Sequence, residues 1–124
     1  MLRMDKYQAL QSFWSSFAIP AYDENSVPDD PAFPYITYSV QTDSLGTPVA
    51  MSASIWYRTY SWEGISMKAE EIARRIVEQN ALPLDNGYLY LTKGTPFAQR
   101  MNDPSDDAIR RVYLNIMAEY LTAY

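Results

Sequence analysis

Carboxylates are the residues of this chain whose spacing comes nearest to a catalytic or metal-binding pattern. Two adjacent pairs, Asp29–Asp30 and Asp106–Asp107, could ligate Mg²⁺ or Ca²⁺, and two carboxylates can also hydrolyse a glycoside. Each pair has a proline close by, however, which is typical of turns and caps, and no segment has the spacing of an EF-hand loop. Nothing fixes which carboxylates would act together, so we expect no metal and no cofactor.

Two missing residue types narrow the chemistry further. The 124 residues include no cysteine and no histidine. This excludes a disulfide framework, a thiolate zinc site, a cysteine nucleophile and the usual general base near neutral pH. Phosphate-binding glycine motifs are also absent. The sequence therefore predicts a protein that is not an enzyme, although a carboxylate-dependent hydrolase with Trp56 and Trp62 stacking on a sugar stays open as an alternative.

The charge is acidic and unevenly distributed. The formal net charge is -5, and no Lys or Arg occurs from Tyr7 to Tyr57. Nucleic-acid affinity depends on neutralising phosphates, so we expect no nucleic-acid partner. The acidic residues of this stretch include Asp23, Glu24, Asp29 and Asp30. They form either a solvated loop or an acidic surface that meets a mixed or basic surface on a partner.

Hydrophobic spacing predicts the elements of the first half. Apolar residues recur at helical spacing over about 3–17, and Pro20 ends that helix. An acidic, proline-rich connector follows over 20–34, with a short extended stretch near Ala21-Tyr22. Residues 35–42 and 49–60 alternate as two strands joined by a turn, which predicts an antiparallel hairpin.

The second half begins with the clearest helix of the chain, over 66–80, with Ser66 as the expected N-cap. A turn at Asn86-Gly87 leads to a strand at 88–93, and the two prolines of 94–107 predict a long loop. The last segment fits both a helical stripe and a strand, and its β-branched and aromatic content favours the strand.

These elements predict a single α+β domain over 1–124, with an antiparallel or mixed sheet of four to five strands packed against two main helices. Apolar residues occur on both faces of the predicted strands. Two helices on one side would leave such a second face exposed, so either another subunit or the chain's own loops must cover it. No signal peptide and no membrane-spanning segment is apparent, which predicts a protein of the cytoplasm.

The order of these patterns resembles a known family. An N-terminal helix, the stretch AYDENSVPDDPAFPYITYSV, the strand SASIWYRT, the helix ISMKAEEIARRIVEQ and the end segment IRRVYLNIMAEYLT look like the tail terminator, or tail completion, proteins of long-tailed bacteriophages and prophages. The resemblance covers almost the whole chain. It rests on the arrangement of patterns, since the family has no strict residue signature to transfer.

The resemblance implies a structural virion-assembly protein. It would form a homo-oligomeric ring, typically a hexamer, that caps the tail tube and meets the head-tail connector protein. The chain would act in the host cytoplasm during assembly and then in the virion, at the tail or neck. From the residue pattern itself we expect three contact surfaces, whose members are the acidic connector residues Asp23, Glu24, Asp29 and Asp30, the strand-end residues Arg58, Tyr60 and Trp62, and the loop residues Phe97, Arg100 and Met101.

Three alternatives stay open at this point. Another neck or head-completion protein of the same virion would share most of these patterns. The carboxylate-dependent hydrolase belongs to a different class, and so does a small-ligand binding module built on the aromatic cluster around Trp56 and Trp62. Metal-dependent activity, or saturable stabilisation of the fold by a ligand, would distinguish the last two.

Overall fold

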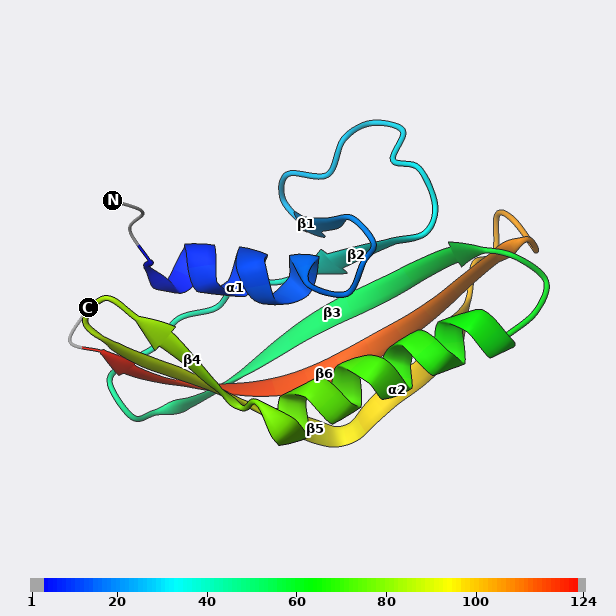
Figure 1. The fold of residues 1–124 in the computed structure, drawn as a ribbon. Helices are drawn as coiled ribbons and strands as arrows, with labels where there is room; N and C mark the ends of the chain where they lie inside the picture. Colours follow the sequence, from blue (N-terminus) through cyan, green and yellow to red (C-terminus); the bar gives the residue numbers. More distant parts are fainter. Residues whose placement is uncertain (1–3, 123–124) are drawn as a thin grey trace.

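The computed structural model describes residues 4–122 and has one six-stranded sheet with two helices (Figure 1). In chain order the elements are α1 (Lys6–Ser15), β1 (Ala21–Asp23), β2 (Tyr35–Tyr38), β3 (Pro48–Arg58), α2 (Glu63–Glu78), β4 (Ala81–Leu84), β5 (Gly87–Asn102) and β6 (Ile109–Thr122). The α+β class is confirmed. The expected four to five strands are in fact six, because the short segments β1 and β4 both join the sheet.

The strands lie in the order β1-β2-β3-β6-β5-β4. β1 runs parallel to β2, and every other neighbouring pair is antiparallel. The hairpin of β2 and β3 confirms the pairing expected from the sequence, and β6 confirms that the last segment is a strand. β3 pairs with β6 over the full length of β3 at the centre of the sheet, so the surfaces at both ends of the molecule are built on these two strands.

One face of the sheet carries the core. Strand alternation places Met51, Ala53 and Ile55 of β3 on this face, beside the even-numbered residues of β6 from Val112 to Tyr120. The apolar sides of α1 and α2 pack on the same cluster. The buried residues that the helices contribute are Leu10, Phe13, Trp14, Ile65, Ala69, Ile72 and Ile76.

Both helices begin at residues other than those predicted from the sequence. α1 starts after Asp5, whose carboxylate accepts a hydrogen bond from the Gln8 backbone N–H at 2.9 Å while the Gln8 side chain caps in return. α2 begins at Glu63 with Trp62 at the N-cap position, so the expected N-cap at Ser66 is wrong. The Ser66 N–H already bonds the Trp62 carbonyl at 3.0 Å, because Ser61 accepts from the Glu63 N–H and begins the turn earlier.

The expected loop over 94–107 is the largest error of the sequence reasoning. β5 continues through it to Asn102, and only 103–108 connect β5 to β6. A register shift between Lys93 and Ala98 accommodates the glycine and proline that suggested a loop. At Gly94 a Cβ would stand 2.9 Å from the Cβ of Asn115, so the close approach of the two strands requires glycine there.

Other bounds shift by a few residues. The first helix spans Lys6–Ser15 rather than 3–17, and residue 3 lies outside the described part of the chain. The strand expected over 35–42 ends at Tyr38. Between residues 4 and 122, no helix is long and apolar enough to cross a membrane.

Candidate interaction surfaces

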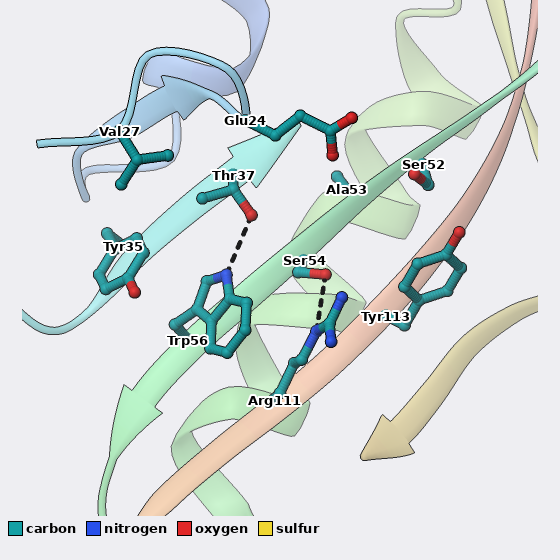
Figure 2. A pocket seen from close by; sticks show the side chains of 10 residues that line it. All are labelled: Glu24, Val27, Tyr35, Thr37, Ser52, Ala53, Ser54, Trp56, Arg111 and Tyr113. Atoms are coloured by element: carbon teal, nitrogen blue, oxygen red, sulfur yellow. Dashed lines mark hydrogen bonds between the residues drawn. The ribbon is translucent and has the colours of Figure 1, made fainter. Parts of the chain in front are cut away.

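The face of the sheet opposite the helices holds a cluster of aromatic rings and one arginine, which we call the aromatic-arginine cluster: Tyr35, Trp56, Arg111 and Tyr113 (Figure 2). The Tyr35 and Trp56 rings stack at 6.0 Å with an interplanar angle of 15°. The Arg111 guanidinium lies 4.7 Å from the Trp56 ring and 5.7 Å from the Tyr113 ring. Register explains the grouping, because Tyr35 pairs with Trp56 and Trp56 pairs with Arg111 across β2, β3 and β6.

A hollow of about 310 Å³ lies over this cluster. Small residues of β3 form its floor, and Glu24 and Val27 of the connector reach its rim (Figure 2). The Trp56 indole N–H donates to the Thr37 hydroxyl at 3.0 Å, and the Arg111 Nε–H donates to the Ser54 hydroxyl at 3.0 Å. These bonds join the strands across the open face.

The charge around Arg111 is balanced by carboxylates. Glu24 stands at the rim of the hollow, and Asp103 in the 103–108 turn is near enough to interact with Arg111. The pKa of Asp103 is lowered, chiefly by hydrogen bonds from the Ser105 hydroxyl and backbone N–H, with Arg111 contributing least. The hollow therefore has no strong net charge, and no group of three or more acidic residues among residues 4–122 could hold a metal ion.

The open face is mixed rather than largely apolar, which corrects the sequence-based picture. On β6 the outward side chains include Tyr113, Met117 and Leu121, but also Asn115 and Glu119, and all are half-buried. Of the connector, Glu24 and Val27 line the hollow over β2, β3 and the start of β6. The chain's own connector therefore shelters one part of this face.

The expected strand-end group of Arg58, Tyr60 and Trp62 is divided by the fold. Arg58 is on the open-face side, where its guanidinium pairs with Asp106 at 2.9 Å and lies 5.0 Å from the Phe33 ring. The pKa of Asp106 is lowered, first by the Ala108 backbone N–H and then by Arg58. Trp62 packs against the core on the helix side, and Tyr60 is 74% exposed.

Trp62 contacts residues from both the strand-end surface and the 94–107 surface, which were predicted as separate. Its ring lies 5.0 Å from the Arg100 guanidinium and 5.2 Å from that of Arg110. Arg110 also donates to the Tyr60 carbonyl at 3.2 Å and to the Asp107 carbonyl at 2.6 Å. The predicted strand-end and 94–107 surfaces thus meet at the start of α2.

The remaining residues of the 94–107 prediction lie on a strand rather than in a loop. Phe97 is half-buried against the core, with the Lys93 ammonium 6.0 Å from its ring. Met101 is 40% exposed near the end of β5. As strand residues these side chains have fixed directions, which makes them better suited to a defined contact than a mobile loop would be.

The acidic connector residues do not converge on one another as a site. Asp23 ends β1 and accepts a hydrogen bond from the Asn25 N–H at 2.9 Å, and Glu24 reaches the hollow. Asp29 and Asp30 are exposed near the middle of the connector. The connector that carries them arches away from the sheet beside β1 and β2 (Figure 1).

The edge of the sheet at β1 is closed by the chain itself. The Ala21 carbonyl accepts from the Gln11 side-chain amide at 3.1 Å, and the Asp23 carbonyl accepts from the Ser26 N–H at 2.8 Å. The Tyr38 hydroxyl donates to the Gln11 side-chain oxygen and holds this amide in place. Because both outward carbonyls are occupied, β1 is a poor template for another strand.

The opposite edge is open. β4 pairs only with Gly87–Tyr90 of β5, and the Leu91 N–H donates to the Asn80 carbonyl at 2.8 Å. From Thr92 to Asn102, β5 has a pairing partner only on its β6 side within the described chain. Lysine, proline and a register shift protect the first half of this segment in the way natural edges are protected. The second half, from Ala98 to Asn102, has no such protection beyond Arg100.

Sequence reasoning missed Arg111 and Arg110, both of which organise the surfaces. Residue alternation along β6 could have placed Arg111 on the same face of the sheet as Trp56, but only if the register between β3 and β6 were known. Glu24 and Trp62 were predicted as contact residues, but as members of separate groups. Their neighbours come from strands that are distant in the sequence.

Comparison with known proteins gives a fold relative. No family model matches the chain, and no curated protein matches its sequence. Among solved structures, the chain is similar to one described as "Virion of native gene transfer agent (GTA) particle", with a TM-score of 0.64 and 19% sequence identity. The likeness covers 92% of this chain and 90% of that one. The two chains therefore share a fold over nearly their whole lengths.

Proposed function

We propose that this chain is a structural protein of a phage-like particle, and that it acts as a tail terminator, a ring that caps the tail tube and joins it to the head connector. The likeness in fold to a chain of a gene transfer agent virion carries the proposal, because it extends over 92% of the chain. The sequence resemblance to tail terminators supports the narrower role.

The surfaces of the molecule support an assembly role over a chemical one. Bulky side chains stand exposed in several places, with Tyr60 at 74%, Met67 at 63% and Tyr88 at 52% exposure. Aromatic residues and methionine are enriched where proteins contact one another. In the hollow at the aromatic-arginine cluster, the Trp56 indole and the Arg111 guanidinium already donate hydrogen bonds to Thr37 and Ser54 within the chain.

Termination by such a ring is geometric. A subunit that presents one surface to its neighbour and a different surface to the next forms a head-to-tail contact, and a ring results when the rotation closes. The ring must match the last layer of the tail tube on one side and exclude a further layer on the other. No covalent step is needed, which agrees with the residue types available.

The decisive experiment measures mass and shape. We expect native mass spectrometry and sedimentation to show closed oligomers, alone or on addition of tail tubes from the particle that contains this chain, and electron microscopy to show rings at one tube end. Tubes assembled without the chain should grow to uncontrolled lengths. Absence of closed oligomers, with and without tubes, would refute the ring.

A neighbouring role in the neck is distinguished by the partner that is bound. A terminator binds tube ends in the absence of the head, whereas an adaptor or head-completion protein binds the head connector and leaves bare tubes unchanged. The comparison requires the full chain with purified tubes and purified heads in separate reactions.

A further inference from the structure

The two lateral sides of the sheet carry opposite charges. β5 contains Lys93 and Arg100 and no acidic residue over its whole length, Gly87–Asn102. On the other side, β1 and the connector contain Asp23, Glu24, Asp29 and Asp30 and no basic residue. In a molecule with a net charge of -5, this strand with two basic and no acidic residues therefore lies on the opposite side of the sheet from the acid-rich segment.

The register places these two sides at the same height of the sheet. Ala21 lies beside Ile36, Ile36 beside Ile55, Ile55 beside Val112, and Val112 beside Arg100. This row crosses five strands from the β1 edge to the open part of β5. With strands spaced about 4.8 Å apart, the two ends are separated by about 19 Å. One copy displaced sideways along this row brings its connector to the β5 edge of the other.

The open edge offers hydrogen-bond donors to such a neighbour. The Leu91 N–H points away from β6, as its bond to Asn80 shows. Leu91 pairs with Ala118, an even-numbered residue of β6. Ala98 and Arg100 also pair with even-numbered β6 residues, Leu114 and Val112, so antiparallel alternation gives their backbone groups the same direction as those of Leu91. The backbone groups of even-numbered β6 residues point towards β3, as the bond from the Gly46 N–H to the Tyr120 carbonyl shows. Ala98 and Arg100 therefore direct their backbone N–H groups outward.

We propose that the β5 edge of one copy, at Ala98–Asn102, receives the acidic connector of a second copy, with Asp29 and Asp30 facing Arg100 and the outward N–H groups. This inference rests on the proposed ring and names the two surfaces that meet in it. The connector is the suitable occupant because it is acidic and projects beside β1, whose own edge is closed by Gln11 and Ser26. The two surfaces differ, so the contact is head-to-tail and can close into a ring.

Cross-linking tests the contact directly, because the chain has no native cysteine. Ala32 in the connector and Ala98 in β5 are both exposed and carry no charge, so Ala32→Cys and Ala98→Cys in one chain leave the charges intact. A short bismaleimide should give a ladder of dimers, trimers and larger species up to a closed ring. A mixture of the two single-cysteine variants should stop at dimers.

A matched control uses two other exposed positions. Leu45→Cys and Met67→Cys, at residues 63% and 63% exposed, should give no ladder under the same conditions. A ladder from the control pair equal to that from the test pair would overturn the proposal. So would the absence of a ladder from the test pair in a sample that native mass spectrometry shows to be oligomeric.

Charge reversal gives an independent readout. Asp29→Lys with Asp30→Lys, or Lys93→Glu with Arg100→Glu, should each weaken association by about tenfold or more and change its salt dependence. The four changes in one chain should restore association to within about threefold of the original, because the contact is re-formed with reversed signs. Circular dichroism checks that each variant is folded.

The outcomes separate this contact from the ring itself. If closed oligomers form equally well in all the charge variants and the cysteine pair gives no ladder, the contact is disproved but the ring is not. A chain that stays monomeric with and without tail tubes would refute both. Pairing of β5 with β5 of a second copy would appear as dimers from Ala98→Cys alone, and that result would also overturn the proposal.

Discussion

The two edges of the sheet differ in how far their unpaired backbone groups are protected from pairing with another chain. At β1 the outward carbonyls of Ala21 and Asp23 are occupied by a side chain of α1 and by a turn. At β5 the segment from Thr92 to Asn102 is protected over its first half by Lys93, Pro96 and a register shift, and its second half is left free. A monomeric protein gains nothing from an unprotected edge, whereas an assembly component needs one specific place for its neighbour. The following predictions test this difference, from the largest expected effect to the smallest.

The sharpest test places proline at two adjacent positions of β5. Gln99 faces Tyr113 in the set that bonds to β6, so Gln99→Pro removes a ladder hydrogen bond and should lower the free energy of unfolding by about 3 kcal/mol. Ala98→Pro removes only an outward N–H and should cost less than about 1 kcal/mol. Urea unfolding measures both. Equal losses would mean that the outer side of β5 is not a free edge.

The closed edge depends on the Gln11 side chain. Gln11→Ala removes its bonds to the Ala21 carbonyl and to Tyr38, and each such bond contributes about 1 kcal/mol, so the loss should be about 1–2 kcal/mol. Amide exchange over β1 should become faster. Gln79→Ala, on an exposed residue at the end of α2, is the matched control and should change the stability by less than about 0.5 kcal/mol.

Between the edges, the core face should respond to alkaline pH. Burial raises the pKa of Tyr120 from 10.0 to about 12, and its hydroxyl donates to the Gln41 carbonyl at 2.6 Å. The folded chain favours the neutral form of the Tyr120 hydroxyl. The stability that this preference provides is complete below pH 10 and is lost as the pH rises towards 12. Tyr120→Phe should lose the hydrogen bond, about 1 kcal/mol, at neutral pH but show a flatter decline over this window. Denaturant unfolding at several pH values measures the difference, and parallel declines would contradict the assignment.

The smallest effect on the stability of the isolated chain is expected at Arg100. Its guanidinium lies 5.0 Å from the Trp62 ring at an exposed position, so Arg100→Ala should cost the isolated chain only about 0.5–1 kcal/mol. Association should fall far more, by about tenfold, if Arg100 serves the neighbour. Arg58→Ala, which breaks the pair with Asp106 on the other face, is the control for association. A larger effect on association from Arg58 than from Arg100 would place the contact on the open face instead.

Much of the fold was predictable from local patterns. The 3.6-residue period identified both helices, and the two-residue alternation of 49–60 identified β3 as a strand. The extended stretch at Ala21-Tyr22 and the strand at the end of the chain were also identified. These predictions succeed because period and β-branched content depend on neighbours that are close in sequence.

The site was predictable only as separate pieces. Trp62 and Arg100 were each chosen for their residue type, but their contact requires β5 to continue past Pro96 and to align with β6. Glycine and proline in 94–107 signalled a loop, and this reading was wrong because an edge strand tolerates a proline that a central strand would not. The role of Arg111 depends likewise on the register of β3 with β6.

The sequence by itself determined the absence of cysteine and histidine chemistry, the acidic first half, and the apolar faces of the helices and strands, since these are properties of composition and short-range order. Only the tertiary structure decided which edge is closed and which is open, and that the acid-rich connector and the acid-free β5 lie at opposite ends of one row. Strand order and register set those positions. They arise from pairing between segments far apart in the chain, which local patterns do not encode.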